Sequence, residues 1–559
     1  MAQTLKTTIK EGAKRALGVN PQDAKISLSY FTVAFVSLLI GGLFGLLQGL
    51  ERAGLIQLPH WLDYYSILTA HGLLLLVVFT ATFTIGYQFA NLSHSLGGLL
   101  PKVRKMAWIG FGLMLIGTVM SATMVLLGKA SVLYTFYPPM AAHPIFYFGL
   151  VLIVLGIWSS CFGVFTNYRH WRKNHPGQTA PLLAYFAMGV FILWFFASLG
   201  VTIEVFMIIP WVLGWVETIN VMISRTLFWW FGHTLVNIWY LVATSAWYVI
   251  VPKILGVNHF NEKLIRLVVI LIVILNIPGG FHHQIIDPAI SIPIKFLHVF
   301  MSLSIAVPSL MTAYAMFRVL EKAGRKNGGT GLLGWFKKLP WGDVRFLAPM
   351  IAMIGFIPGG AGGIVNTSNQ LNQVVHNTMW VVGHFHVTVG VSVVLTFFGI
   401  CYWMIPHLAG RQLTPQMNKI GVIQTIVWTV GMTIMAGSMH IAGLFGDPRR
   451  TSDTSYGGHE AALNWLNFEI IFGVGATILL IGVLIQVYAV FNMMFFAPKG
   501  HTEFPVATAA PGAPKAPMWT ERWGLWAVLL LAVVAMAYVV PIVDMIWNAP
   551  PGSPPFKMY

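Results

Sequence analysis

Charged side chains and cysteine are scarce in this sequence. Only 9% of the 559 residues are charged, whereas 57% are hydrophobic, and the mean hydropathy is +0.74. A soluble globular protein carries about a quarter charged residues, so a soluble domain and a disordered chain are both excluded. The small number of charges also argues against a nucleic-acid partner, despite a net charge of +16. The two cysteines, Cys161 and Cys401, lie far apart in apolar runs, so any metal must be held by histidine.

Long apolar runs recur along the whole chain. We expect about thirteen transmembrane helices, because each run reaches the roughly 20 residues that cross a lipid membrane. The expected fold is an all-α, polytopic membrane bundle in which residues 1–559 form a single transmembrane catalytic domain. The candidate helices begin near Leu28, Ile67, Met106, Pro144, Pro181, Thr226, Leu264, Ile294, Phe346, Thr378, Ile420, Asn464 and Trp523.

Positive charge is distributed unevenly between the connections. When alternate connections are assigned to opposite sides, most of the 33 Lys and Arg residues fall on one side, in segments such as 102–105 and 318–345. The positive-inside rule makes that side cytoplasmic. We therefore expect a multi-pass protein of the inner (plasma) membrane. Its N-terminal segment 1–27, which is too polar for a signal peptide, is expected in the cytoplasm, and its C-terminus outside.

Several of the 18 histidines lie within apolar runs, where ionisable groups are costly and usually functional. These histidines are His71, His233, His282, His283, His384 and His386. Any one of them alone could be a hydrogen-bonded core residue, but six together indicate bound cofactors. Histidines near loops, such as His94 and His170, are expected to be solvated or interfacial.

His384 and His386 stand two residues apart in segment 382–388. Each residue turns a helix by about 100°, so these two side chains project toward roughly opposite faces. One helix can therefore offer an imidazole to a flat cofactor on either side. Two hemes that flank one helix need this arrangement.

His233, His282 and His283 supply three more imidazoles from two helices. Three neutral nitrogens make a half-open metal site with room for a substrate-derived ligand. Adjacent histidines point about 100° apart on a regular helix, so the local backbone must be distorted. Pro278 and the glycines that follow it can supply that distortion.

These motifs resemble subunit I of the heme-copper oxygen reductase superfamily, in particular its B-family members. The resemblance extends over almost the whole chain, in segments 225–233, 279–287, 307–312, 355–366, 376–378 and 383–386. It implies the heme-copper oxidase subunit I fold with two hemes. His71 and His386 would bind a low-spin heme, and His384 would bind a high-spin heme. The second metal would be held by His233, His282 and His283.

Arg449 and Arg450 are adjacent on the side where cations are scarce. Guanidinium groups bind carboxylates bidentately, so we expect both to bind heme propionates; contacts with lipid headgroups are the alternative. The sequence has no cysteine cluster for a binuclear copper centre and no CxxCH motif for heme attachment. We therefore expect a second subunit, carrying binuclear copper or heme c, to bring electrons from cytochrome c or a quinol.

Asn237 stands where the B-family oxygen reductases have a tyrosine that is linked to the first metal-binding histidine. Residues i and i+4 share a helix face, so Asn237 is expected beside the metals, but an amide can donate neither an electron nor a proton. Cleaving dioxygen in one step needs four electrons, and without the tyrosine the fourth is missing. Joining two nitric oxide molecules into nitrous oxide and water needs only two. We therefore predict a respiratory nitric oxide reductase, since nitric oxide reductases related to these oxidases share the loss of the tyrosine.

The identity of the second metal and the reaction both have alternatives. Three nitrogens without a carboxylate favour copper over non-heme iron. A B-family terminal oxygen reductase (cytochrome oxidase) would need its fourth electron from elsewhere, such as Trp229 or Trp230. A transporter or channel with structural histidines would contain no heme.

The resemblance also implies a polar proton track from the cytoplasm. The matching positions are Ser309, Thr312, Tyr248 and Thr244, the last of which replaces a tyrosine. Hydroxyls in apolar helices can instead bond a carbonyl one turn back. Asn372 replaces an aspartate of the family that is associated with proton loading, which argues against pumping, although His376 remains as a titratable neighbour. Glu204 and Glu469, membrane acids without an evident partner, are further candidates for handling protons.

Overall fold

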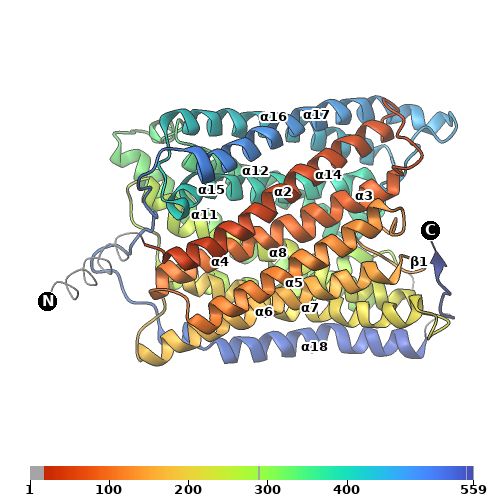
Figure 1. Ribbon diagram of the computed structural model, residues 1–559, viewed down its shortest axis with the longest axis horizontal. Helices are drawn as coiled ribbons and strands as arrows, with labels where there is room; N and C mark the ends of the chain where they lie inside the picture. The colour runs from red at the N-terminus through yellow and green to blue at the C-terminus, as the bar shows by residue number, and fades with distance from the viewer. Residues whose placement is uncertain (1–17, 288–289, 549–550, 558) are drawn as a thin grey trace.

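Long helices run side by side along one axis of the molecule, and the start of α2 and the strand β2 lie at opposite ends of the bundle (Figure 1). The computed structural model describes residues 18–287, 290–548, 551–557 and 559. The first helices are α2 (Pro21–Arg52), α3 (Tyr64–Gly72), α4 (Thr80–Leu96), α5 (Pro101–Leu126), α6 (Pro144–Asn174), α7 (Leu182–Val212), α8 (Val221–Ile254) and α9 (Glu262–Leu275). The later ones are α10 (Ile292–Ser304), α11 (Ala306–Lys326), α12 (Val344–Thr367), α13 (Asn369–Val375), α14 (Met379–Phe385), α15 (Val394–Ala409), α16 (Pro415–Leu444), α17 (Leu466–Phe491) and α18 (Trp523–Trp547).

The number of membrane spans agrees with the sequence. Within the described residues, 12 helical segments are long and apolar enough to cross a membrane. The pair formed by α9 and the 3-10 helix η2 (Ile277–Gln284), which is bent by 50°, brings the total to 13. The predicted all-α polytopic bundle is therefore confirmed.

The first span begins earlier than hydropathy predicts, at Pro21 instead of near Leu28. Asp23 is fully buried there, with an ion pair of 2.5 Å to Arg104 and hydrogen bonds from the Ser93 hydroxyl and the Leu99 amide. These partners satisfy a carboxylate that would otherwise be too polar for a helix in this position. Residues 1–17 of the predicted cytoplasmic segment lie outside the described residues.

Two π-helical stretches adjoin predicted heme ligands. The stretch η1 (Leu73–Phe79) begins two residues after His71, and η4 (His386–Val393) begins at His386 itself. Both lie inside longer spans, Tyr64–Leu96 and Met379–Ala409. Single π-helical turns within α-helices are frequent at functional sites. Here they lie in the two spans that carry His71 and His386.

The backbone distortion predicted before His282 is present. Residues Pro278 to Gln284 continue the chain as a 3-10 helix after the bend at the end of α9. A side chain at Gly280 would collide with the Tyr538 hydroxyl of α18, and its Cβ would lie 2.9 Å from the Trp229 carbonyl oxygen of α8. Glycine is therefore required for this segment to approach α8 closely enough to present its histidines.

Buried ion pairs fasten the last span to the bundle. Glu521, in the 3-10 helix η7 (Met518–Glu521) before α18, accepts hydrogen bonds from Arg266 (2.6 Å), from the Ala180 amide (2.8 Å) and from the Tyr168 hydroxyl. At the other end of α18, the short strand β2 (Phe556–Lys557) pairs in parallel with β1 (Met140–Ala141). Both ends of the last span are thereby held by segments distant in sequence.

Candidate metal centre and heme cavity

A cavity of about 810 Å³ lies inside the bundle and is lined mainly by apolar side chains. Its volume is typical of ligand and cofactor sites. The predicted site residues that line it are His71, His233, Asn237, His282, His283, Ser309, His384, His386, Arg449 and Arg450. The structure thus brings together all six predicted histidines, from α3, α8, η2, α14 and η4.

His71 and His386 face each other across this cavity with nearly parallel rings. Their ring centroids are 6.4 Å apart and the planes differ by 13°. Two imidazoles that ligate one ion from opposite sides, each nitrogen about 2 Å from the metal, hold their centroids about 6 Å apart. The spacing therefore fits a bis-histidine heme.

Each of these two rings is oriented by a backbone carbonyl. His71 Nδ1 donates to the Gly41 carbonyl at 2.8 Å, and His386 Nδ1 donates to the Val382 carbonyl at 2.8 Å. These bonds set the tautomer and leave Nε2 of both rings free to ligate iron. A side chain at Gly45 would come within 2.6 Å of His71, so glycine in α2 makes room for the ring.

His384, in α14 two residues before His386, lines the same cavity. A Cβ at Gly362 of α12 would lie 2.8 Å from His384 Nδ1, so glycine on the facing helix accommodates this ring as well. His282 and His283 line the same cavity as His384. His384 could therefore hold a second heme on the side of the cavity where the three-histidine cluster lies.

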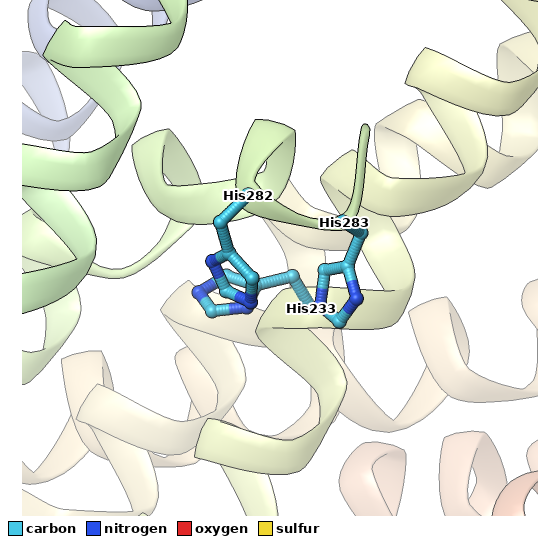
Figure 2. Close-up of side chains that lie close together, drawn as sticks. All are labelled: His233, His282 and His283. Carbon is cyan, nitrogen blue, oxygen red and sulfur yellow. The ribbon is translucent and has the colours of Figure 1, made fainter. Parts of the chain in front are cut away.

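His233, His282 and His283 converge on one point, as Figure 2 shows. Their potential ligand atoms all lie within 4.8 Å of one another. Nε2 of His233 is buried and has no hydrogen-bond partner among the described residues. A buried, unpartnered nitrogen beside two more imidazoles fits a bound metal ion, and a donor set of nitrogens alone favours copper over iron.

Two neighbours fix the ligand rings on η2. His282 Nδ1 lies 2.9 Å from the Ser302 hydroxyl, whose single hydrogen has two acceptors in reach, the carbonyls of His298 (2.8 Å) and Gly279 (3.1 Å). Since the hydroxyl hydrogen is directed at a carbonyl, Ser302 accepts from His282 and leaves Nε2 of that ring for the metal. The Trp229 ring stacks on His283 with centroids 3.7 Å apart and planes 6° apart.

Asn237 lies one turn after His233 on α8, as the spacing predicts. Its amide nitrogen donates to the His233 carbonyl at 3.3 Å. Its carboxamide oxygen accepts no hydrogen bond from the part of the chain that the structure describes, and the residue lines the cavity. The next tyrosine on α8, Tyr240, stacks its ring on Phe356, with centroids 4.5 Å apart and planes 10° apart.

Arg449 and Arg450 line the cavity with an excess of positive charge. Arg449 donates to the Asn377 side-chain oxygen (2.7 Å), while Arg450 Nη2 is buried without a hydrogen-bond partner among the described residues. The guanidinium groups of Arg450 and Arg225 lie 5.5 and 5.4 Å from the centre of the Tyr137 ring. Burial and the adjacent Arg450 lower the pKa of Arg449 to about 10.

The backbone is strained at Arg450 and at Asn377, the residue that Arg449 contacts. Asn377 and Arg450 have φ angles of 59° and 70°, in the left-handed region that non-glycine residues rarely adopt. Such conformations cost energy and persist where the surroundings impose them, often at ligand sites. The unpartnered guanidinium, the depressed pKa and the strain together fit a pair of carboxylates, as two heme propionates would supply.

The amide of Asn372 holds the neighbouring histidine. His376 Nδ1 donates to Asn372 Oδ1 at 2.8 Å, and Asn372 Nδ2 donates to the Asn366 carbonyl. Burial and the charges of Arg449 and Arg225 lower the pKa of His376 to about 4. The imidazole is therefore neutral at physiological pH.

The predicted proton track is assembled only in part. Tyr248 donates to Thr312 at 2.9 Å, and the Tyr240 phenol lies beside Thr312 and Ser309. Thr244 donates to the Leu241 carbonyl of its own helix at 3.0 Å. Its hydroxyl therefore makes the local backbone bond that was the alternative to a place in the proton track. Ser309 lines the cavity and could pass a proton to it.

The two membrane acids do have partners, contrary to the sequence interpretation. Glu204 accepts a hydrogen bond of 2.8 Å from Ser224, and Glu469 forms an ion pair of 3.1 Å with Arg52. Sequence reasoning also missed Ser302, because a serine in an apolar helix carries no signal for a distant histidine. His94, expected to be solvated or interfacial, is only half-buried and stacks on Phe504 with centroids 4.1 Å apart.

Comparison with known proteins gives matches over nearly the whole chain. Residues 25–478 match the family model described as cytochrome c and quinol oxidase polypeptide I. Cytochrome c oxidase subunit 1 of Thermus thermophilus is 36% identical over 544 residues, which cover 95% of this chain and 96% of that protein. A probable cytochrome c oxidase subunit 1 of Bradyrhizobium diazoefficiens is 23% identical, over 83% of this chain and 69% of its own length. A heme-copper terminal oxidase dimer solved by cryo-EM aligns with 96% of this chain and 95% of its own, with a TM-score of 0.88 and 31% identity.

Proposed function

The chain belongs to the heme-copper oxidase subunit I family, and on this premise we propose that it is the catalytic subunit of a respiratory nitric oxide reductase. Family membership makes it a membrane-bound oxidoreductase of respiratory electron transport. The proposed reaction joins two nitric oxide molecules, with two electrons and two protons, into nitrous oxide and water. It would take place between His384 and the cluster of His233, His282 and His283.

Asn237 is the observation that carries this proposal. It lies beside His233 on the wall of the cavity, where the resemblance to B-family oxygen reductases leads us to expect a tyrosine. A carboxamide has no accessible oxidised form and does not titrate in the working pH range. Position 237 can therefore supply neither the fourth electron nor the proton that splitting dioxygen in one step requires. Nitric oxide coupling requires neither from this position.

The chain's own residues would bind and orient the two metals. His384 would hold a high-spin heme, and the three-histidine cluster would hold the second metal, with copper favoured by its nitrogen ligands. When bound and reduced, these two metals store the two electrons that the coupling consumes. Ser302 orients His282, and the apolar cavity wall excludes bulk water from the gas.

The oxygen of Asn237 gives this residue a direct role. One hydrogen of its nitrogen goes to the His233 carbonyl, and its oxygen has no donor among the described residues, so the oxygen is available to the cavity. We infer that it accepts a hydrogen bond from the water that the reaction forms. Protons would come by way of Tyr248, Thr312 and Ser309, whereas Thr244 is turned to its own helix.

Electron entry requires a partner. His71 and His386 would hold the low-spin heme that receives electrons, and His384 lies two residues from His386. A second subunit with binuclear copper or heme c would accept electrons from cytochrome c or a quinol. The complex would span the inner (plasma) membrane with the N-terminus in the cytoplasm, as the distribution of positive charge predicts.

Dioxygen reduction is the second candidate, and the names of the relatives favour it. The Thermus thermophilus and Bradyrhizobium diazoefficiens proteins are both named as cytochrome c oxidase subunits. If this chain reduces dioxygen, the missing electron must come from another aromatic ring. Trp229, stacked on His283, is placed to supply it.

Product analysis tests the proposal. The complete complex, reduced by its donor and given isotopically labelled nitric oxide, is expected to release labelled nitrous oxide with one molecule formed for two consumed. Heme and metal analysis of the same sample is expected to give two hemes and one further metal. Nitric oxide that binds without nitrous oxide formation would overturn the proposal.

A further inference from the structure

A second cluster of charged side chains lies beside the cavity. Arg52, the last residue of α2, is 3% exposed and forms ion pairs with Asp447 (2.8 Å from Nη2 to Oδ1) and Glu469 (3.1 Å from Nε to Oε1). Asp447 is 0% exposed and Glu469 is 1% exposed. The three residues come from α2, the connection after α16 and the first turn of α17, so the fold brings them together from distant parts of the chain.

The cluster holds one cation against two carboxylates. The remaining donors of Arg52 go to the carbonyls of Thr451 (2.8 Å) and Pro448 (3.0 Å). Oδ2 of Asp447 is buried and accepts no hydrogen bond from the described residues, although the Glu469 carboxyl lies within hydrogen-bonding reach of Asp447. Two ionised carboxylates in contact away from water repel each other. One proton between them removes the repulsion and supplies the donor that Asp447 Oδ2 lacks.

Arg52 connects this cluster to the heme cavity. It lines the cavity together with His71 and Tyr64. Its bonds to the carbonyls of Pro448 and Thr451 also hold the segment that carries Arg449 and Arg450, the residues expected to bind the heme propionates. Among the described residues, the titratable groups that face the carboxylate pair are Arg52 and Tyr64. Because this interior is poorly screened, a charge added in the cavity acts strongly on the pair.

We propose that Asp447 and Glu469 bind a single proton between them, and that reduction of the heme held by His71 and His386 increases the affinity for that proton. The electron goes to the heme, and one carboxylate gains an O–H bond, so each event adds one charge of opposite sign to the same region. The cluster becomes electrically neutral when the proton is bound. This proton site would serve nitric oxide reduction and dioxygen reduction equally. A negative result for the site would therefore leave the proposed function unaffected.

Infrared difference spectroscopy of the complete, heme-loaded complex tests this inference directly. Reduction of the wild type is expected to produce a carboxylic-acid C=O band that shifts in D2O. The band should be lost in Glu469→Gln, which retains a polar group opposite Arg52, and lost or shifted in Asp447→Asn. It should persist in the control Glu460→Gln, since Glu460 is an exposed glutamate nine residues earlier.

A redox titration gives an independent readout. The midpoint potential of the low-spin heme is expected to fall with rising pH in the wild type and in Glu460→Gln, and to fall less steeply in Glu469→Gln. A wild-type spectrum without the C=O band, or equal slopes in the wild type and Glu469→Gln, would overturn the proposal. If Glu469→Gln does not assemble, the same two measurements on Asp447→Asn decide it.

Discussion

Asn237 donates a 3.3 Å hydrogen bond from its amide nitrogen to the backbone carbonyl of His233, one turn earlier on α8. The bond uses one hydrogen of the amide and holds the side chain on the wall of the cavity, where its oxygen accepts no hydrogen bond from the described residues. Beside the three-histidine cluster, position 237 thus provides a hydrogen-bond acceptor in place of a redox-active ring.

Replacing Asn237 by leucine is expected to lower nitric oxide turnover about tenfold, because one hydrogen bond to the reacting molecules is worth about 1 to 1.5 kcal/mol. Leucine has a similar volume, so heme and metal contents should not change. Asn237→Tyr is also expected to retain the second metal. Steady-state nitric oxide consumption and metal analysis measure both effects. Equal turnover in Asn237→Leu and the wild type would mean that the amide only fills space.

Ser302→Ala is expected to weaken binding of the second metal by roughly 10- to 100-fold, as is typical when the partner of a ligating histidine is removed. The hydroxyl accepts from His282 Nδ1 at 2.9 Å and so holds this ring in position. Ser304→Ala is the matched control, since the Ser304 hydroxyl bonds only the Met301 carbonyl among the described residues. Competition with a chelator measures the affinity, and equal losses in the two variants would contradict the role of Ser302.

Glu521→Gln is expected to destabilise the protein by roughly 3 kcal/mol, because it leaves the fully buried Arg266 with less compensating charge. Glu503→Gln provides the contrast. Glu503 pairs with Lys253 at 3.0 Å, but its side chain is 62% exposed, so its loss should cost little. Thermal unfolding in detergent compares the two variants. A similar melting temperature for both would show that Glu521 does not fasten α18.

The lowered pKa of His376 predicts that the stability of the protein depends on pH. Burial, reinforced by nearby arginines, holds its pKa at about 4, compared with 6.5 for a free imidazole. Between these values the unfolded chain binds more protons than the folded one, so this group makes stability fall as the pH falls from 6.5 to 4. His376→Gln, which can still donate to Asn372, should show a smaller decrease in melting temperature between pH 7 and pH 5. The same decrease in both proteins would contradict the assignment.

The spans and the six histidines could be predicted because lipid imposes strong rules on sequence. An imidazole stands out in an apolar run, and a proline followed by two glycines marks the bend before His282. Contacts between side chains from distant segments leave no such trace. In the sequence, Arg52 is only a cation at a helix end and Glu469 only an isolated acid, and their ion pair is known from the fold alone. Ser302 likewise cannot be distinguished in the sequence from other serines in helices.

The most direct test of the account compares nitric oxide and dioxygen reduction by one preparation of the complete complex, with the same electron donor. If the carboxamide at position 237 leaves the centre without a fourth electron, nitric oxide is reduced much faster than dioxygen. Dioxygen reduction to water that equals or exceeds nitric oxide turnover would contradict the account and make the chain a terminal oxidase like its named relatives.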